Sequence, residues 1–395
     1  MTGRLTGTMR DVLIPRNEIV HPRDKPTGEA IFVGLEHIEP GTGRRIGSLP
    51  IRLEELTGRK ARFRPGDIVY GYLRPYLNKV WVADFDGFSS VDQYVFEVVG
   101  AAPKYIAAYM RSPEFLSNAP IAETPGQLPR IRLDEILGVP ITLPSVDDQL
   151  RIAAELTSQF AAVDDLSHRA DARASSLREL RANTVDEPYD RAPNAWPRRG
   201  VESVARIQTG YAFKSEWFTG AGIRLLRNAN VGHEAIDWTD VVRLPVELAH
   251  GFVQFQLAEG DTVLSLDRPI VAAGIKVARL TAADVPSLLL QRVARFIVGP
   301  DVDADYLYHF LLTRQFTSAI SAHDHSLGVP HVSPRQVGSV VLPLPSLVIQ
   351  RRIASQLRER LAAIDAGRAA LESEREAIEG LTAALLRRAF RDVAA

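Results

Sequence analysis

The sequence predicts an α/β (α+β) fold with two mixed α/β domains, separated by two long helices that form an antiparallel coiled coil with internal pseudo-two-fold symmetry. Three observations support this prediction. A segment of the chain recurs about 200 residues later, the apolar residues after each copy have a helical period, and short strand-like runs occupy the rest. The expected boundaries are residues 1–143 and 188–343 for the domains and residues 144–187 and 344–395 for the helices.

The size and composition are those of a globular protein with more than one core. The chain has 395 residues, of which 46% are hydrophobic and 24% charged. It has no run of about 18 apolar residues, and residues 1–20 carry charges where a signal peptide needs an apolar stretch. The absence of cysteine excludes disulfides and thiolate metal sites. We therefore expect a cytoplasmic protein.

The charge distribution excludes nucleic-acid binding through a global positive field, because the net charge is −1. Residues 144–190 carry 5 Arg and 10 Asp or Glu, whereas residues 191–343 carry 15 Lys or Arg and 14 Asp or Glu. The excess acid thus lies on the first predicted helix. Any binding to DNA must come from local groups on nearly neutral domains.

An internal repeat organises the chain. The segment LPSVDDQLRIAAEL at residues 143–156 returns as LPSLVIQRRIASQL at residues 344–357, with an offset of 201 that takes Gln149 onto Gln350. The register holds without a gap from Tyr105 to Asp164 at matching positions. Further upstream the pattern persists in PGDIV (65–69) and EGDTV (259–263), and in the Arg-Pro pairs at residues 74–75 and 268–269. A period near 200 residues indicates a domain duplication rather than a solenoid.

Each repeat opens a helix with an apolar stripe. The mean apolar spacing after Pro144 is about 3.5 residues, which is the coiled-coil value. A single stripe of this kind also fits a helix packed on a globular core, but two copies in register favour an antiparallel pair. The residues expected to form the helix pair are Ile152, Leu156, Phe160, Val163, Leu177, Ile353, Leu357, Leu361, Ile364, Leu371 and Ile378.

The remaining segments contain short strand-like runs punctuated by Gly and Pro. The predicted strands cover residues 68–73, 79–83, 94–99, 262–266 and 294–298. Residues 187–197 contain three prolines and are expected to be a linker into the second half. Within it, the DEPYD segment at 186–190 superficially resembles a methyltransferase motif, but we interpret it as a helix stop.

The doubled Leu-Pro-Ser-x-x-x-Gln-x-x-Ile-Ala-x-x-Leu element resembles the repeated regions of the specificity subunits of Type I restriction–modification systems. Residues 196–231, which contain TGYAFKS, and residues 66–79 are similar to parts of the family's target-recognition domains. The first half lacks TGYAFKS, so its first 40 residues cannot be matched.

The resemblance implies two domains that each read half of a split double-stranded DNA site. The paired helices would set the spacing between the half-sites and dock two adenine-methyltransferase subunits, with motor-nuclease restriction subunits as further partners. The apolar helix positions given above are the candidate docking residues. Changing the helix length is then expected to change the spacer between half-sites, and because the two domains differ in sequence, the site is expected to be asymmetric.

The chain lacks the motifs that an independent enzyme of this kind needs. It has no Gly-x-x-x-x-Gly-Lys-Ser/Thr loop, no Asn-Pro-Pro-Tyr/Phe motif and no Gly-rich strand-to-helix turn. We therefore expect a non-catalytic chain without a cofactor or metal. S-adenosylmethionine, ATP and Mg²⁺ are expected on the partner subunits only. The His323-Asp-His325 cluster suggests a metal site, but the sequence offers no distant third ligand.

Candidate DNA-binding residues are loop side chains whose donors and acceptors suit base edges or phosphates. Each also has a simpler interpretation as a surface ion pair or turn residue. The candidates are Arg74, Tyr76, Asn78, Lys79, Gln127 and Arg130 in the first domain, and Lys214, Arg227, Asn228, Asn230, Arg268 and His331, with His323 and His325, in the second.

Two other functions fit the same pattern. One is a two-lobed DNA-binding adaptor of another phage-defence or DNA-modification system. The other is a coiled-coil interaction protein without a nucleic-acid role. Co-purification with an adenine methyltransferase distinguishes the first hypothesis from the adaptor, and salt-dependent binding to bipartite DNA distinguishes both from the third.

Overall fold

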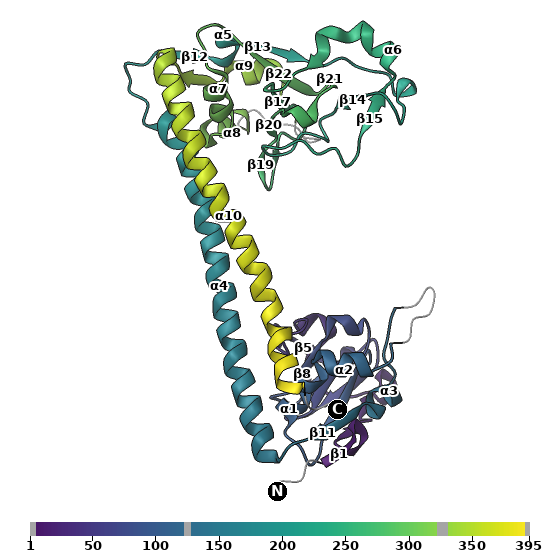
Figure 1. The fold of residues 1–395 in the computed structure, drawn as a ribbon. Coiled ribbons are helices and arrows are strands. Elements are labelled where there is room, and N and C mark those ends of the chain that lie inside the picture. The colour runs from purple at the N-terminus through teal and green to yellow at the C-terminus, as the bar shows by residue number, and fades with distance from the viewer. Residues whose placement is uncertain (1–4, 122–127, 322–330, 392–395) are drawn as a thin grey trace. The chain divides into compact units, whose positions relative to one another are not determined.

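A computed structural model describes residues 5–121, 128–321 and 331–391. The chain divides into two compact units, Met1–Ala172 with Leu371–Ala395 (unit 1) and Arg173–Ala370 (unit 2). Each unit contains one mixed domain and a segment of each long helix, α4 (Val146–Asp190) and α10 (Leu347–Phe390) (Figure 1). In the described ranges no helix combines the length and apolar character that a bilayer crossing requires.

The domain of unit 1 contains two main sheets. The first has the antiparallel order β2-β10-β7-β8, with bounds Leu13–Pro15, Gln93–Val98, Ile68–Gly71 and Val80–Val82. The second has the order β3-β6-β9-β4-β5, with bounds Ile19–Val20, Lys60–Phe63, Gly87–Ser90, Glu29–Val33 and Leu49–Arg52. Within it β4 and β9 run parallel. A separate pair joins β1 (Leu5–Thr8) to β11 (Pro140–Leu143).

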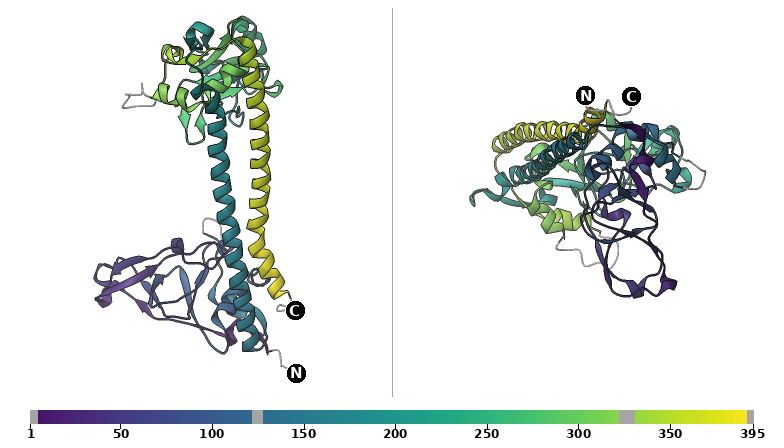
Figure 2. Two further views of the ribbon diagram at one scale, coloured as in Figure 1. Left: turned by 90° about the vertical axis from the view of Figure 1, so that its left-hand side faces the viewer. Right: turned by 90° about the horizontal axis from the view of Figure 1, so that it is seen from below.

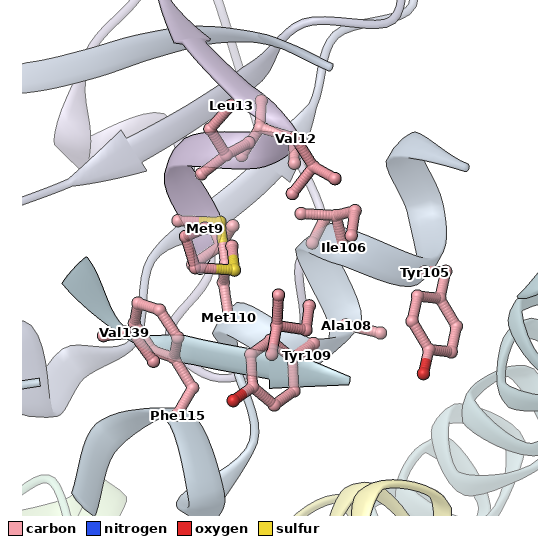
Figure 3. Close-up of a cluster of buried hydrophobic side chains, with 14 of the residues drawn as sticks. Met9, Val12, Leu13, Tyr105, Ile106, Ala108, Tyr109, Met110, Phe115 and Val139 are labelled. Atoms are coloured by element: carbon pink, nitrogen blue, oxygen red, sulfur yellow. The ribbon is translucent and has the colours of Figure 1, made fainter. Parts of the chain in front are cut away.

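Three short helices cover the first sheet of unit 1. They are α1 (Pro103–Met110), α2 (Pro113–Asn118) and α3 (Leu133–Gly138). Helix α1 is buried from Tyr105 to Met110, because the sheet, α2 and the long helices surround it. Figure 3 shows Tyr109, Phe115 and Met9 meeting in this core.

Unit 2 repeats this topology. Its sheets have the orders β13-β22-β17-β20 and β15-β14-β21-β16, and β14 runs parallel to β21 as β4 does to β9. The bounds in the first sheet are Ala205–Thr209, Val293–Val298, Thr262–Ser265 and Val277–Arg279. Those in the second are Val242–Leu244, Ile223–Leu226, Ser287–Leu289 and Gln256–Leu257. The pair β12 (Arg198–Gly200) and β23 (Val341–Pro343) matches β1 and β11.

The helices of unit 2 and one added hairpin complete the domain. The helices are α5 (Val201–Val204), α6 (Val246–Ala249), α7 (Ala304–Leu311), α8 (Arg314–Ser321) and α9 (Pro334–Ser339). The hairpin of β18 (Ile270–Val271) and β19 (Gly274–Ile275) lies in the loop between β17 and β20. The five strands predicted from the sequence correspond to β7, β8, β10, β17 and β22.

The shared topology aligns parts of the domains that the sequence could not match. The parallel pairs place β4 on β14 with an offset of 193, which takes Val33 onto Leu226. After each strand the chain makes the same turn: the N–H of Gly34 donates to Nδ1 of His37 at 3.0 Å, and that of Arg227 donates to Oδ1 of Asn230 at 3.2 Å. Different side chains therefore cap one conserved backbone turn.

The repeated glutamine ties each long helix to its own domain. Gln149 accepts a hydrogen bond from the N–H of Ala102 and donates to the carbonyl of Pro144, both at 2.9 Å. Gln350 likewise accepts a hydrogen bond from the N–H of Asp303 at 2.9 Å and donates one to the carbonyl of Pro345 at 2.8 Å. Both amides are buried, so each holds the start of a long helix against the start of α1 or α7.

The other end of each long helix docks through an aromatic side chain. Phe390, at the end of α10, packs on Tyr105 and Tyr109 of α1, with ring centroids 5.2 and 5.5 Å away. Tyr189, 201 residues earlier at the end of α4, packs in the same way on Tyr306 and Phe310 of α7. Each unit therefore contains the start of one long helix and the end of the other, and the two views in Figure 2 agree that these segments lie side by side within each unit.

The fold-class prediction is confirmed: two mixed domains are combined with two long helices that pack together in opposite directions. Most of the residues predicted for the helix pair are buried, namely Leu156, Val163, Ile353, Leu357, Leu361, Ile364, Leu371 and Ile378. Ile152, Phe160 and Leu177 are half-buried.

Helix α4 ends at Asp190, within the segment 186–190 predicted as a helix stop, but it continues through Pro188, so residues 187–190 are helical and not part of the predicted linker. A proline removes one helical hydrogen bond, but here tertiary contacts hold the last turn. Buried Asp186 accepts hydrogen bonds from the backbone N–H and Nε of Arg314, at 2.8 and 2.5 Å, and Tyr189 donates its hydroxyl hydrogen to the carbonyl of Tyr306 at 2.8 Å.

Candidate nucleic-acid interface

Two loops of the first domain are held together beyond the end of β7. Leu73 forms a β-bridge with Arg130. The N–H of Arg74 donates to the carbonyl of Pro129 at 2.8 Å, and that of Ile131 donates to Tyr72 at 3.1 Å. Residues 72–79 and 128–131 thus form one surface, which we name loop pair 1.

Arg74 occupies an unusual position in loop pair 1. Its backbone is left-handed, with φ of 50°, and Pro75 follows it directly. This conformation costs a non-glycine residue about 1–2 kcal/mol, and such strain concentrates at functional sites. The side chain is exposed and forms no hydrogen bond or ion pair with the described residues. Tyr76 on the following turn is 63% exposed. Both side chains can therefore contact a ligand.

The second domain builds the same pair of loops. Arg268 is left-handed with φ of 44° and precedes Pro269, and Asp267 forms the β-bridge with His331. The N–H of Val332 donates to the carbonyl of Leu266 at 2.9 Å, as Ile131 does to Tyr72. Residues 266–276 and 331–332 are named loop pair 2. Arg74 and Arg268 are equivalent, whereas Arg130 is replaced by His331.

The chemistry of the two loop pairs differs. Nδ1 of His331 lies 3.0 Å from Oδ1 of Asp267, and Nη1 of Arg292 lies 3.3 Å from Nε2 of His331. In loop pair 1 the equivalent of Asp267 is the apolar Leu73. The two surfaces therefore share a backbone frame but present different donors and acceptors.

Four predicted DNA-contacting side chains, and the backbone carbonyl of a fifth candidate residue, instead make internal contacts. Asn78 donates to the carbonyl of Arg111, and Nζ of Lys79 donates to that of Leu35, both at 2.6 Å. In the second domain the residues concerned are Arg227, Asn228 and Asn230. The side chain of Asn230 is 2% exposed and donates to two backbone carbonyls. The side chain of Arg227 pairs with that of Asp240 at 2.9 Å. The backbone carbonyl of Asn228 accepts a hydrogen bond from Nζ of Lys276 at 2.5 Å. These residues shape the loops that carry the exposed arginines.

The other candidates are placed as follows. Arg130 is partly exposed within loop pair 1. Lys214 is exposed and lies 3.5 Å from Glu216, outside loop pair 2. Gln127, His323 and His325 lie outside the described residues. Among the described residues no group of three or more His, Asp or Glu could hold a metal ion.

Comparison with known proteins yields several relatives. No protein-family model matches the chain. The specificity subunit of the Type I restriction enzyme EcoAI from Escherichia coli is 41% identical over 175 residues, covering 44% of this chain and 29% of the relative. The MjaVIII specificity subunit from Methanocaldococcus jannaschii is 29% identical over 253 residues, covering 61% and 59%. The aligned stretches thus span less than two thirds of these relatives.

Solved structures share the fold over nearly the whole chain. One of these structures concerns the complex assembly and conformational transition of the type I R-M system. Its matching chain has a TM-score of 0.82 and 19% sequence identity, and the alignment covers 99% of the present chain and 98% of that chain. The HsdS subunit from Thermoanaerobacter tengcongensis has a TM-score of 0.62, with 20% identity and coverage of 99% and 97%.

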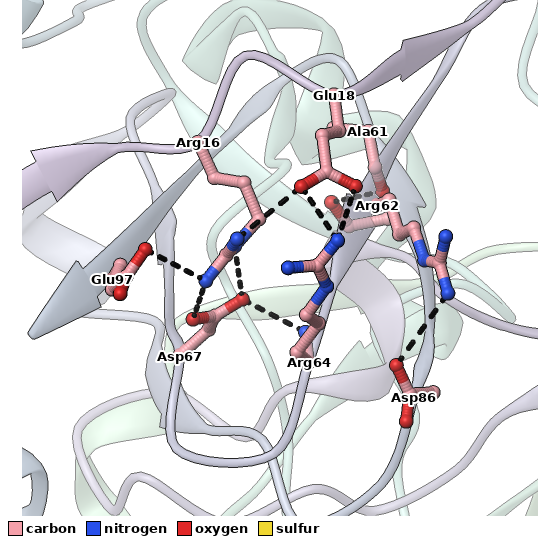
Figure 4. A network of polar contacts seen from close by, with 9 residues as sticks. Arg16, Glu18, Ala61, Arg62, Arg64, Asp67, Asp86 and Glu97 are labelled. Atoms are coloured by element: carbon pink, nitrogen blue, oxygen red, sulfur yellow. Dashed lines mark hydrogen bonds and ion pairs between the residues drawn. The ribbon is translucent and has the colours of Figure 1, made fainter.

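The chain is therefore similar in sequence to specificity subunits of Type I restriction enzymes and shares its fold with the solved HsdS subunit. The repeated Gly-Asp of this chain is visible in the sequence, but the sequence assigns it no role. In Figure 4, Asp67 accepts from Nε of Arg16 at 2.7 Å, from Nη2 of Arg16 at 2.9 Å and from the backbone N–H of Arg64 at 2.8 Å. This bidentate hydrogen bonding raises the pKa of Arg16.

The aspartate of the second Gly-Asp, in the domain of unit 2, has different partners. Asp261 accepts from Nη1 of Arg295 at 3.0 Å and from the N–H of Ala258 at 2.9 Å. Arg16 follows β2 and Arg295 lies on β22, so the arginine comes from different strands in the two halves. The aspartate could be found by its repetition, but its partners could not, because they do not recur at equivalent positions.

Proposed function

We propose that this chain is the DNA sequence-specificity subunit of a Type I restriction–modification complex and binds an asymmetric bipartite site. Loop pair 1 contacts one half-site and loop pair 2 the other. The observation that supports this most directly is the exposed, left-handed Arg-Pro at equivalent positions of both domains. A guanidinium fixed in this way suits bidentate hydrogen bonding to guanine O6 and N7, or a phosphate.

The long helices set the distance between the half-sites in this proposal. Helix α4 has 45 residues, which at 1.5 Å per residue corresponds to about 68 Å. Half-sites read from one face of a duplex are separated by multiples of roughly 34 Å. A helix pair of this length is sufficient for a spacer of one turn or more.

The chain acts without catalysis of its own in this proposal. It docks adenine-methyltransferase subunits, two copies in keeping with its internal duplication, and motor-nuclease subunits through the long helices. These partners carry S-adenosylmethionine, ATP and Mg²⁺. The complex acts in the cytoplasm, where the host DNA lies.

The methylome of a host that expresses this chain with its methyltransferase tests the proposal. We expect methylated adenines in a split, asymmetric motif that disappears when this chain is deleted. Methylation that persists after the deletion, or a continuous palindromic motif, contradicts the proposal. Binding to DNA without any methyltransferase association favours the adaptor instead.

Replacing Arg74 or Arg268 by alanine is expected to weaken binding of the matching half-site only. The loss of one bidentate contact corresponds to about 1–3 kcal/mol, or roughly 5- to 150-fold in affinity. Competition binding at fixed salt with DNA altered in one half-site measures the effect for each variant. Arg23→Ala is the matched control, because this 79% exposed arginine lies outside loop pair 1. Equal losses in all three variants would contradict the assignment.

A further inference from the structure

A groove of about 720 Å³ lies in unit 1 beside the long helices. The loop 39–44 forms one wall, and the facing segments of α4 and α10 form the other. Four carboxylates line it, those of Glu39, Asp164, Asp171 and Glu379, against the two arginines Arg44 and Arg111. The lining therefore has a net negative charge, which disfavours DNA as a ligand.

The internal repeat shows what fills the equivalent place in unit 2. There Arg181 of α4 pairs with Glu234 and, at 3.2 Å, with Asp365 of α10. The side chain of Arg181 is only 14% exposed. An arginine from the chain itself thus occupies this position in the second half.

All three members of that ion-pair network have equivalents in the groove. The offset of 201 takes Arg181 onto Thr382 and places Asp365 on Asp164, and the offset of 193 places Glu234 on Gly41. Thr382, Asp164 and Gly41 all line the groove. The groove is therefore the equivalent place in unit 1, with Arg181 replaced by the short side chain of Thr382 and Glu234 replaced by Gly41.

Asp171 pairs with Arg375 at 3.1 Å and Glu39 pairs with Arg44 at 2.7 Å, but other acceptors in the groove remain unused. Oδ1 of Asp365 accepts from both Arg181 and Arg368, whereas Arg44 is the one cation that pairs with Asp164 within the described residues. Glu379 has no ion pair in those ranges. Oδ1 of Asn78 is buried and has no hydrogen-bond partner among the described residues, although the Nδ2 of the same amide is bonded. A buried acceptor left unpaired is costly, and a guanidinium N–H would satisfy it.

From these observations we infer that the groove binds the side chain of an arginine supplied by a partner protein. The planar guanidinium offers five donors to the carboxylates and to the amide oxygen, and it tolerates burial better than an ammonium group. The apolar lining from Val163, Ile378 and Leu386 suits the methylene stem. The inference rests on the proposed function only in requiring a protein partner.

A small ligand tests the groove itself on the full chain. N-acetyl-arginine amide is expected to raise the melting temperature in a saturable manner, whereas the isosteric, uncharged N-acetyl-citrulline amide is not. Thr382→Arg supplies the guanidinium internally and should abolish the response to the arginine ligand. Glu379→Gln, which removes an exposed carboxylate, should weaken it. Ala384→Arg adds the same charge at an exposed site outside the groove and should keep the full response. Equal responses to arginine and citrulline, or an unchanged response in Thr382→Arg, would overturn the inference.

The complex with the methyltransferase tests the partner. Thr382→Arg should bind that subunit about tenfold more weakly or worse, whereas Ala384→Arg should bind it normally. Unaltered binding by Thr382→Arg overturns the inference and leaves the proposed function intact. If the unmodified chain fails to bind the methyltransferase, the proposed function is contradicted. The melting-temperature response to N-acetyl-arginine amide then shows independently whether the groove binds a guanidinium.

Discussion

Asp67→Ala is expected to destabilise the first domain by about 3–5 kcal/mol, because it leaves the Arg16 guanidinium buried without its counter-charge. The side chains of Arg16 and Asp67 are only 11% and 3% exposed. The change also removes the acceptor that holds the turn at Arg64. The remaining contacts of Arg16 with Glu18 and Glu97, at 3.3 and 3.1 Å, involve more exposed carboxylates and compensate little.

Urea unfolding followed by the fluorescence of Trp81 measures this loss in the first domain, because the other three tryptophans lie at or beyond residue 196. Trp81 packs on Phe63 and Phe85 in the second apolar cluster of that domain. Asp86→Ala is the control: its pair with Arg62 is exposed and 3.8 Å long, so the expected loss is within about 1 kcal/mol. Similar losses for both variants would show that burial of the Arg16 pair carries no special energy.

Phe390→Ala is expected to destabilise unit 1 by about 3–5 kcal/mol, the cost of removing a buried phenylalanine. The ring is fully buried between Tyr105 and Tyr109, and no other aromatic side chain of α10 among the described residues can replace it. Because it lies in the last turn of α10, its loss also removes the contact that docks this helix end.

Trypsin cleavage at Arg387 and Arg388 reports this undocking, since both residues are exposed next to Phe390. Cleavage should become faster in Phe390→Ala, together with a lower unfolding midpoint. Leu381→Ala is the matched control on the same helix, because that side chain is 37% exposed and its truncation should cost less than about 1 kcal/mol. Unchanged cleavage and stability in Phe390→Ala would contradict the docking role.

The two halves of the chain keep one structural frame but differ in their exposed loops. Both domains keep the Gly-Asp turn, the glutamine at the helix start and the aromatic contact at the helix end. They differ at the exposed loops, where Leu73 and Arg130 in one half correspond to Asp267 and His331 in the other. Packing requirements preserve the frame, whereas surface loops tolerate variation and carry recognition.

The candidate interface was only partly predictable from the sequence. Arg74 and Arg268 could be selected because both precede a proline in a repeated pattern. Asn230 could not be separated from them, because a loop asparagine that caps a turn and one that faces solvent have the same local sequence signals. The groove beside the helices was not predictable either. It is open because Thr382 has a short side chain, whereas the equivalent residue in the other half is the long Arg181.

The sequence by itself determined the duplication, the two long helices and the positions of five strands in the first sheets of the two domains. Periodicity and self-similarity are local properties of the chain, and they survive wherever one face of an element must be buried. Only the tertiary structure decided which arginine neutralises each repeated aspartate, how α4 continues through Pro188, and which polar loop residues face solvent. These outcomes depend on side chains far apart in the sequence, whose partners no local pattern specifies.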